Sequence, residues 1–509
     1  MPPRVSGLRL STFLVTSCLA VPASAATIEV GPADDVEGAI AMLQPGDELV
    51  LRGGAYSLSG RFGISIAGTE AMPIVIRSRE GEVAHLHRDL ADQNIVDIDS
   101  ADWVVLRGIE FSGGSAGIRV SAATHLTIEG CEVHDTGDVA IRFNDTGARY
   151  DSIRIVRNHV HHTNGTGEGM YLGCNSNACQ FANGLVEGNY VHHTNQATVE
   201  QGDGIELKEG SFNTVIRDNV IHDTHYPCIL TYSTVGNGAP NVIERNALWH
   251  CGDHGIQSAA DAIIRNNVIL SAASDGIAMQ PHQAGIPSNL VVAHNTVFDS
   301  GGAALSLRSN NGSVVIANNA LFASTGDALL VVDGDAAMVV VTGNVVEGAT
   351  SVSSGVVPGD LVRDFVSAGY AGAPPMDPFP KAGGALVGMG DVAYVATDDF
   401  NGTARDGVAD VGAYKFDPAG NPGWVLAEAP KASGPVPPPP GTDAGVPPPG
   451  TDGGTTAAPP DTGSGCGCRV ARDDRFIAAS ALAVATSVLV TLRARRRRAR
   501  VRAPRARRS

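Results

Sequence analysis

A group of ionisable side chains near the middle of the 509-residue chain has the types needed for proton transfer. Lys208, one of only four lysines, lies close in sequence to Asp203 and Glu206, and Glu168 precedes them. A neutral amine can take the proton at C5 of a uronic acid unit, and a hard cation on the three carboxylates can neutralise the substrate's own carboxylate. We therefore expect Lys208 as a base beside a Ca²⁺ site, with a plain ion pair between Lys208 and the acids as the simpler alternative.

The same acids also fit a second chemistry. Two carboxyl groups that flank a glycosidic bond can serve as the acid and the base or nucleophile of a glycoside hydrolase. Glu168, Asp203 and Glu206 could supply such a pair, and their separation would indicate inversion or retention.

A recurring Asn divides the middle of the chain into repeats of roughly 21 to 31 residues, the length of one solenoid coil. Each repeat holds a β-branched run, the Asn, a short strand, a polar turn and a second run. The positions are Asn158, Asn189, Asn219, Asn246, Asn267, Asn295, Asn319 and Asn344, with Cys131 in the first copy. Alternation within each run points the aliphatic side chains inward, and neighbouring coils then stack as parallel strands. The repeats predict an all-β fold, a right-handed single-stranded parallel β-helix with an internal Asn ladder.

Because coils stack in register, equivalent positions of successive repeats form columns on one face. One column reads Arg142, Tyr171, Glu206, Leu230 and Gln257, and the column beside it reads Asn144, Gly173, Lys208 and Tyr232. We expect Arg142 and Tyr232 to assist Lys208 in catalysis. We expect Tyr171, Asn144 and Gln257 to contact the substrate.

The first part of the mature chain fits the same design. Residues 36–43 have helical apolar spacing, and Pro45, Gly46 and Asp47 then turn the chain into a strand. A short N-terminal capping helix would cover the open end of the first coil.

Two segments resemble known β-helix proteins. Residues 44–56 and 68–78 resemble the opening of polysaccharide lyases of the chondroitinase B and alginate lyase kind, and residues 399–414 resemble the closing segment of extracellular β-helix proteins. With the repeats, the likeness covers residues 27–416. It implies a pectin-lyase-like β-helix, a uronic acid polysaccharide as substrate and Ca²⁺ as cofactor.

The resemblance also assigns roles. In the similar lyases a Lys base works beside acidic Ca²⁺ ligands and an Arg from the following coil. Lys208, with Asn213 shortly after it, matches the base, and Asp203 lies near a ligand position. The Arg is absent, and Tyr232 stands in that stretch instead. The D-P-H-D motif of the similar mannuronan epimerases is also absent.

A histidine column forms a second cluster. Its members are His134, His161, His192 and His222, followed at the next position by Asp135, His162, His193 and Asp223, with His250 after them. Stacked imidazoles and carboxylates about 4.8 Å apart have the right types to bind a transition metal. Rings that stack at the turns to cover apolar edges explain the same pattern, and we favour that interpretation.

Both ends of the chain carry export signals. Arg4 and Arg9 precede an apolar run over 10–21, and a small-residue site ends at Ala25, so residues 1–25 are expected to be a signal peptide. A lipoprotein box ending at Cys18 is the alternative. Residues 26–417 would form the β-helix, and residues 418–465 a Pro-, Gly- and Thr-rich linker.

The last residues resemble the MYXO-CTERM sorting signal. Cys466 and Cys468 precede an apolar run over 476–492 and a tail with ten arginines. Residues 466–509 would therefore comprise a Cys motif, a transmembrane helix and a cytoplasmic Arg tail. The resemblance implies a membrane helix that lasts until a sorting protease acts, and final attachment at the cell surface. A plain single-span anchor is the alternative.

Charge and cysteine content limit the partners. Setting aside the ten tail arginines leaves about 26 basic side chains against 53 acidic ones, which argues against nucleic acid. Cys174 and Cys179 are spaced for a loop disulfide in an oxidising compartment, whereas the pairing of Cys131, Cys228 and Cys251 is left open. We expect a monomer.

The combined sequence features predict a surface-anchored extracellular β-helix protein that acts on or binds polysaccharide, with β-elimination of a uronic-acid glycan as the first hypothesis. A non-catalytic module that binds glycan along its long flat face is one alternative. A structural surface protein and a glycoside hydrolase are the others.

Overall fold

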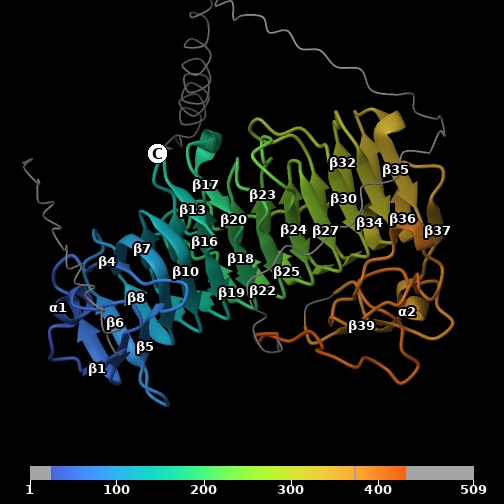
Figure 1. Ribbon diagram of the computed structural model, residues 1–509. Helices are drawn as coiled ribbons and strands as arrows, with labels where there is room; N and C mark the ends of the chain where they lie inside the picture. The colour runs from blue at the N-terminus through green and yellow to red at the C-terminus, as the bar shows by residue number, and fades with distance from the viewer. Residues whose placement is uncertain (1–24, 372–373, 432–509) are drawn as a thin grey trace, which may run out of the picture. The chain divides into compact units, whose positions relative to one another are not determined.

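The computed structural model describes residues 25–371 and 374–431 of the chain. In this part of the chain, short parallel strands stack into a long solenoid, drawn from blue to orange in Figure 1. Two long strands, β7 (Val96–Arg107) and β34 (Ala320–Val332), run from one face of the solenoid to the next, and 37 strands thereby join in one sheet. The right-handed parallel β-helix that the repeats predict is confirmed.

The sheet folds into three faces that run along the solenoid, and the first face begins at the N-terminus. Its strands pair in parallel from coil to coil, beginning with β1 on β2 and ending with β33 on β35. They are β1 (Thr27–Val30), β2 (Glu48–Leu51), β5 (Ile74–Ser78), the second half of β7, β10 (Ala123–Glu129), β14 (Arg154–Val156), β18 (Leu185–Glu187), β21 (Val215–Arg217), β24 (Asn241–Glu244), β27 (Ala262–Arg265), β30 (Leu290–Ala293), β33 (Val314–Ala317) and β35 (Val339–Thr342).

The second face follows the Asn of each repeat. Its strands are β3 (Gly54–Ser57), β6 (Ala84–Arg88), β8 (Ile109–Gly113), β11 (Glu132–His134), β15 (His159–His161), β19 (Tyr190–Thr194), β22 (Val220–Thr224), β25 (Ala247–Cys251), β28 (Val268–Leu270), β31 (Thr296–Phe298), the first half of β34, β36 (Asn344–Thr350) and β37 (Val356–Pro358). The residue after several of these strands, such as Asp135 or His162, has a positive φ, a conformation that Asp, Asn and His tolerate better than most residues.

The third face carries the second run of each repeat. Its strands are β4 (Gly63–Ala67), the first half of β7, β9 (Ile118–Val120), β12 (Ile141–Phe143), β16 (Met170–Leu172), β20 (Ile205–Leu207), β23 (Ile229–Thr231), β26 (Ile256–Ser258), β29 (Ile277–Met279), β32 (Leu305–Arg308) and the second half of β34. Two further strands, β13 (Arg149–Asp151) and β17 (Gln180–Ala182), bridge this face and the first.

The interior is a continuous apolar core with one polar row. Inward Val, Ile and Leu side chains of all three faces are buried, for example Ile155, Val160 and Leu172. The Asn residues of the repeat form a ladder beside them: Asn189 Nδ2 donates to Asn219 Oδ1 at 2.9 Å and to the Ile155 carbonyl at 2.9 Å. The same pair of bonds recurs from Asn158 to Asn319, which satisfies the buried amides.

Short helices and a C-terminal segment close the solenoid. Helix α1 (Val36–Ala41) begins at Asp35, whose side chain accepts from the Gly38 amide, and it buries Val36 and Ile40 against the first coil. Beyond the last coil come α2 (Leu361–Asp364), β38 (Phe365–Ser367) and β39 (Asp377–Pro380). Single 3₁₀ turns lie at η1 (Asn175–Asn177), η2 (Ala336–Met338) and η3 (Val392–Tyr394).

The C-terminal segment packs on the outside of the second face, as the orange chain beside β25 and β36 in Figure 1 shows. There the strands present Trp249, Phe298 and Phe322 outward, and Phe365 of the segment packs on the two phenylalanines. The second face is therefore apolar where the segment covers it. The preceding coils carry histidines at the same position, with His222 opposite Trp249 and His192 opposite His222.

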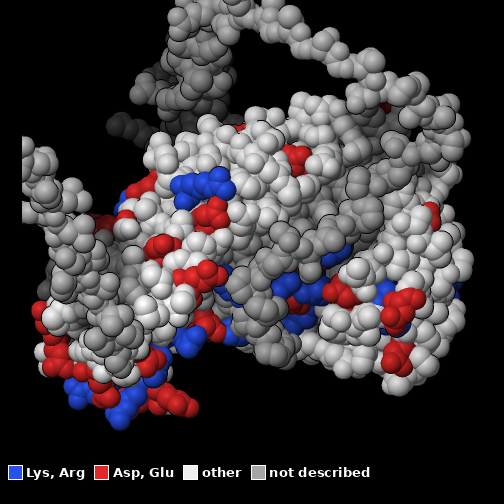
Figure 2. Space-filling view, viewed as in Figure 1, with Lys and Arg blue, Asp and Glu red and all other residues white. Residues whose placement is uncertain are grey.

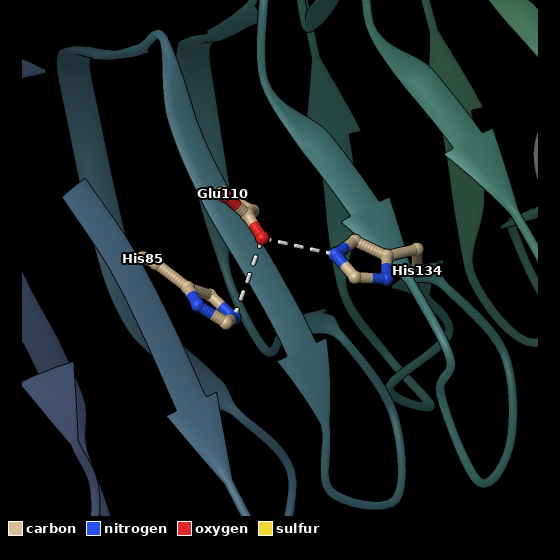
Figure 3. A group of neighbouring side chains, drawn as sticks. All are labelled: His85, Glu110 and His134. Carbon is tan, nitrogen blue, oxygen red and sulfur yellow. Dashed lines mark hydrogen bonds and ion pairs between the residues drawn. The ribbon is translucent and has the colours of Figure 1, made fainter. Parts of the chain in front are cut away.

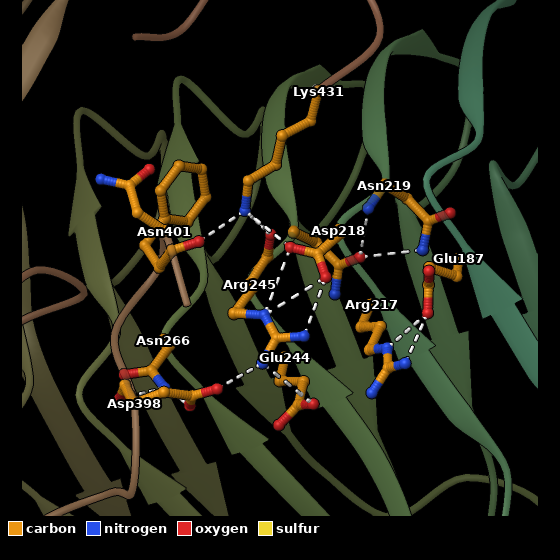
Figure 4. Close-up of polar contacts among 12 residues, drawn as sticks. Glu187, Arg217, Asp218, Asn219, Glu244, Arg245, Asn266, Asp398, Asn401 and Lys431 are labelled. Atoms are coloured by element: carbon orange, nitrogen blue, oxygen red, sulfur yellow. Dashed lines mark hydrogen bonds and ion pairs between the residues drawn. The ribbon is translucent and has the colours of Figure 1, made fainter. Parts of the chain in front are cut away.

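A buried ionic network holds the end of the C-terminal segment (Figure 4). Lys431 Nζ donates to Asp218 Oδ1 at 2.8 Å and to the Phe400 carbonyl at 2.5 Å. Arg245 contacts both Asp218 and Asp398, at 2.8 and 2.5 Å. Because two cations share the Asp218 carboxylate, the segment is tied to two coils of the solenoid.

Opposite charges lie side by side on the surface in view in Figure 2. On the first face, ion pairs link neighbouring coils, such as Arg107 with Glu129 at 3.1 Å and Arg265 with Glu244 at 2.7 Å. A pair whose arginine is exposed, such as Arg107 with Glu129, contributes roughly 0–1 kcal/mol, whereas Glu244 of the second pair is buried.

Within residues 25–371 and 374–431 there are two disulfides, Cys174–Cys179 within a loop and Cys228–Cys251 between neighbouring coils. Cys131 is buried with a free thiol in the first place of the Asn ladder. The expected signal peptide, most of the linker, the Cys466 and Cys468 motif and the apolar run over 476–492 lie outside the described residues. Among the helices of residues 25–371 and 374–431, none combines the length and apolar character needed to cross a bilayer.

Candidate functional site

The third face places one column of the expected site in register. Strands β12, β16, β20, β23 and β26 pair in parallel, so that Arg142 lies opposite Tyr171, and Tyr171 opposite Glu206. Glu206 in turn lies opposite Leu230, and Leu230 opposite Gln257. Their strand neighbours, such as Ile205 and Leu207, point into the core, and the column therefore lies on the outer side of the face.

Lys208, Glu206 and Tyr232 form a closed triangle of hydrogen bonds. Lys208 Nζ donates to Glu206 Oε1 at 2.5 Å and lies 3.0 Å from the Tyr232 hydroxyl. The Tyr232 hydroxyl donates to the same carboxylate oxygen at 2.8 Å. All three side chains are buried, and only 4% of Lys208 is exposed. The ion pair that the sequence offered as the simpler alternative is thus present in the structure.

Two tyrosine rings surround the Lys208 ammonium. Its Nζ lies 4.9 Å from the centre of the Tyr171 ring and 4.4 Å from that of Tyr232, distances at which an aromatic face stabilises a cation. Burial raises the pKa of both phenols, and the Glu206 charge raises it further. Tyr171 and Tyr232 therefore stay protonated at neutral pH, and the Tyr232 hydroxyl donates to Glu206.

Three carboxyl groups meet beside this triangle without enough partners. One oxygen each of Glu168, Asp203 and Glu206 lies within 4.8 Å of the others, and all three side chains are buried. Both oxygens of Glu168, Oδ1 of Asp203 and Oε2 of Glu206 accept no hydrogen bond. Burial and the neighbouring carboxylates raise the pKa of Asp203 well above its usual range, and burial raises that of Glu168.

This donor set fits a hard cation. Buried carboxylates without partners cost several kcal/mol unless they are protonated or bind a metal ion. Ca²⁺ is held by carboxylate and other oxygen ligands, and this cluster offers four buried carboxylate oxygens that make no other bond. The residues that the sequence assigned to a Ca²⁺ site thus converge in space and offer four of the six to eight oxygen ligands that Ca²⁺ takes.

Two loops cover the cluster, here called the covering loops, residues 174–179 and 281–285. Gln283 Nε2 donates to Asn175 Oδ1 at 2.9 Å and thereby joins them. The 281–285 loop also contacts the site directly: His282 Nε2 lies 3.2 Å from the Tyr232 hydroxyl, and the Ala284 amide donates to Glu209 Oε1 at 3.0 Å. These loops consequently close the face at Lys208.

The other expected residues are less closely tied to Lys208. Arg142 Nη1 donates to Asp138 Oδ2 at 3.1 Å, an ion pair on its own coil. Gln257 is 5% exposed, two coils beyond Glu206 in the register, and Asn144 is partly exposed just after β12. Tyr171 and Tyr232 therefore belong to the cluster, and Arg142, Asn144 and Gln257 surround it at a distance.

Sequence reasoning did not single out His282 or Gln283. Burial and the nearby Lys208 charge lower the pKa of His282, and the ring is neutral at neutral pH. His282 and Gln283 lie in the 281–285 loop between β29 and β30, and Glu209 lies against it. Connections of similar length follow β16 and β23, so loop length gave no signal that this loop folds back over Lys208.

The comparisons with known proteins agree on the fold. No curated protein matches the sequence. Among solved structures, pectate lyase Pel9A superposes with a TM-score of 0.50 and 15% identity over 77% of this chain and 97% of its own. The PL6 family alginate lyase AlyGC does so with 0.50 and 16% over 77% of this chain and 59% of its own.

At such identities the likeness establishes the architecture alone. The family described as "Right handed beta helix region" matches residues 59–200 and 180–321, which together span just over half of the chain. These matches cover the coils that carry Lys208, the acid cluster and the Asn ladder. The chain therefore belongs to the right-handed β-helix family.

Proposed function

We propose that this protein acts on an extracellular polysaccharide that contains uronic acids, at the site formed by Lys208, Tyr232 and the acid cluster. The reaction that suits these groups is β-elimination, with Lys208 as the base. Glu168, Asp203 and Glu206 would hold the Ca²⁺ ion. A bound Ca²⁺ would neutralise the uronate carboxylate and so make the proton at C5 more acidic.

One observation carries this proposal: four buried carboxylate oxygens without partners lie beside the only lysine of the repeats. A structural ion pair alone would need one carboxylate, and Glu206 already supplies it. Glu168 and Asp203 add two carboxyl groups that the Lys208 charge does not balance. Their convergence is costly in the absence of a ligand, which favours a binding role for the cluster.

The geometry suggests a division of labour among the side chains. Lys208 Nζ and the Tyr232 hydroxyl are 3.0 Å apart. The amine would therefore take a proton from one atom of the sugar, and the phenol would give a proton to an atom close to it. Because its pKa is raised, Tyr232 has the proton that a leaving oxygen requires. Glu206 accepts from both groups and holds them in place.

The test is product formation by the purified full chain on a panel of uronic acid polysaccharides, with Ca²⁺ or with a chelator. Elimination creates an unsaturated uronate, which we would follow by its ultraviolet absorbance. We expect a signal that requires Ca²⁺, is lost in Lys208→Ala and persists in the matched control Lys381→Ala, whose lysine contacts only the Val362 carbonyl outside the site. Equal activity of Lys208→Ala and the control would refute the assignment of the base.

A second candidate function is a non-catalytic glycan-binding or structural surface protein, in which the cation only stabilises the fold. The cover over Lys208 favours it, since no sugar reaches a side chain that is 4% exposed unless the covering loops move. Binding to the polysaccharide panel without any product, and without new reducing ends, would support this candidate over the lyase.

The glycoside hydrolase alternative has less geometric support. Inverting enzymes hold their two carboxyl groups roughly 6.5–9.5 Å apart to admit a water molecule, and retaining enzymes about 5–5.5 Å apart. The ligand atoms of Glu168, Asp203 and Glu206 lie within 4.8 Å of one another, which suits shared cation binding better than either arrangement.

We also propose that the protein is exported and attached at the cell surface, through the signal peptide over 1–25 and the sorting signal over 466–509. The two disulfides support an oxidising compartment, since such bonds are rare in reducing cytosol. Protease treatment of intact cells should remove the β-helix from the wild type. A chain truncated before Cys466 should instead appear in the medium.

A further inference from the structure

The second face carries a histidine and carboxylate array on six successive coils, from His85 to His222, away from the Lys208 site on the third face. Its inner row comprises His134, His161, His192 and His222. The Nε2 atom of each of these imidazoles contacts a side chain of the preceding coil. The contacts are Glu110 to His134 at 3.2 Å, Glu132 to His161 at 3.0 Å, His159 to His192 at 2.8 Å and Tyr190 to His222 at 2.9 Å. The array is thus a regular diagonal lattice that follows from the coil register.

The lattice contains two groups with a common composition, two imidazoles and one glutamate. In the first group Glu110 Oε1 lies 3.5 Å from His85 Nε2 and 3.2 Å from His134 Nε2, as Figure 3 shows. In the second, Glu132 Oε1 lies 3.3 Å from His159 Nδ1 and 3.0 Å from His161 Nε2. The three ligand atoms of each group lie within 4.8 Å of one another.

These separations match a tetrahedral metal shell. Zinc holds imidazole nitrogen and carboxylate oxygen at about 2.0–2.1 Å, so that neighbouring ligands of a tetrahedron stand about 3.3 Å apart. The four glutamate-to-histidine distances range from 3.0 to 3.5 Å. Two histidines and a glutamate are also a ligand set of protein zinc sites in which the fourth position is left to water.

The outer nitrogens of two ligands are held in the way that metal-binding histidines require. Asp135 Oδ2 lies 2.7 Å from His134 Nδ1, and His162 Nδ1 lies 2.7 Å from His161 Nδ1. A partner of this kind fixes the ring and leaves the other nitrogen for the metal. Both partners occupy the positive-φ position after their strand, with φ of 51° and 55°.

Exposure separates these groups from a purely packed ladder. The Glu110 and Glu132 side chains are 23% and 42% exposed, so that an ion and its water can enter. A third group, His193, His222 and Asp223, differs because His222 is 2% exposed and its Nε2 contacts the Tyr190 hydroxyl, which lies outside the group. We assign no ion to that group.

We propose that the second face binds two divalent transition-metal ions, of which Zn²⁺ is the best fit, one at His85, Glu110 and His134 and one at Glu132, His159 and His161. Ring stacking between His134 and His161, with centroids 5.0 Å apart, couples the two sites through neighbouring coils. In the first site the Ser112 hydroxyl, 2.6 Å from His85 Nε2, would have to release that nitrogen to the metal.

The test uses the full chain, stripped with a chelator and then given Zn²⁺, with bound metal measured by elemental analysis after gel filtration. We expect two zinc ions per wild-type chain. Glu110→Gln and Glu132→Gln should each lose one and the double variant both, since the amide keeps the size of the side chain but ligates poorly. Asp203→Asn should retain both ions, which keeps this result separate from the acid cluster of the third face.

The matched control is His125→Gln. His125 also pairs with a carboxylate, Asp102, at 3.1 Å and stacks on Trp103, but it belongs to neither group. It should keep both ions. Substitution by Co²⁺ should give a visible absorption band of tetrahedral intensity in the wild type, weakened by about half in each single glutamine variant.

A second measurement needs no variant. Zn²⁺ should protect His159 from modification by diethyl pyrocarbonate, read by peptide mass spectrometry, and should leave His125 as reactive as before. Absence of bound zinc in the wild type, unchanged zinc in the double glutamine variant, or unprotected His159 would each overturn the proposal.

Discussion

The amide of Gln283 donates to Asn175 Oδ1 at 2.9 Å and joins two loops that are more than a hundred residues apart in the sequence. This contact links the two covering loops to each other, and His282 and Ala284 also hold the second loop against the site. It lies at the exposed edge of the site, whereas the groups beneath it are almost fully buried. Access to the cluster therefore depends on how often this bond opens.

Gln283→Ala should make Lys208 more accessible. The loss of one exposed hydrogen bond costs about 1 kcal/mol, which corresponds to about a five-fold rise in the open population. Acetylation of Lys208, followed by mass spectrometry, should speed up by that factor. Gln44→Ala is the control, because Gln44 makes its side-chain bonds beside the N-terminal helix. An equal rate in both variants would mean that other contacts hold the loops.

Ca²⁺ should stabilise the wild-type chain, and Asp203→Asn should abolish the effect. An ion that binds only the folded state at a hundred times its dissociation constant contributes about 2.7 kcal/mol. Thermal unfolding with and without Ca²⁺ measures the shift. Without calcium, Asp203→Asn should be at least as stable as the wild type, because the amide removes repulsion among the buried carboxyl groups.

The control for that experiment is Asp253→Asn, an exposed position that should keep the full calcium response. A calcium shift of equal size in Asp203→Asn would place the ion elsewhere.

Asp218 should make the stability sensitive to acid. Burial opposes its ionisation, but Lys431 and Arg245 outweigh burial and hold its pKa below the usual range. A lowered pKa contributes stability that is fully present above the unfolded-state value of about 3.9 and is lost as the pH falls through the lower folded-state value. Asp218→Asn should therefore cost about 3 kcal/mol at pH 6 and much less near pH 2.

Urea denaturation of the wild type and of Asp218→Asn at both pH values tests this expectation. Asp333→Asn, an exposed position with a similar positive φ, is the control and should stay within about 0.5 kcal/mol of the wild type. A gap between wild type and Asp218→Asn that does not change with pH would contradict the assignment of the charge.

The Asn ladder should be intolerant of substitution. Asn219 donates to Val186 and Asn246 and accepts from Asn189, and it is fully buried. Asn219→Ala leaves these buried partners unpaired, at roughly 1–3 kcal/mol for each group. We expect a loss of at least about 3 kcal/mol in urea denaturation, whereas the exposed Asn311→Ala should be nearly neutral. A loss below 1 kcal/mol would show that water replaces the amide.

The repeat in the sequence predicted much of this architecture. A recurring Asn at one coil length predicted the ladder, and the position of each outward side chain relative to that Asn predicted that Tyr171 and Glu206 would lie opposite each other. Parallel coils repeat their register, so one alignment of the sequence with itself places every strand. The convergence of Glu168, Asp203 and Glu206 followed from the same regularity.

Only the tertiary structure decided which side chains of neighbouring columns contact each other and which segments cover the columns. The diagonal contact of Glu110 with His134 depends on side-chain direction between neighbouring coils, and the expectation of simple ring stacking did not contain it. The cover over Lys208 depends on the direction in which the 281–285 loop folds, and Lys431, one partner of Asp218, comes from a segment some 200 residues later. Periodicity determines what repeats, whereas these contacts occur once and depend on the complete fold.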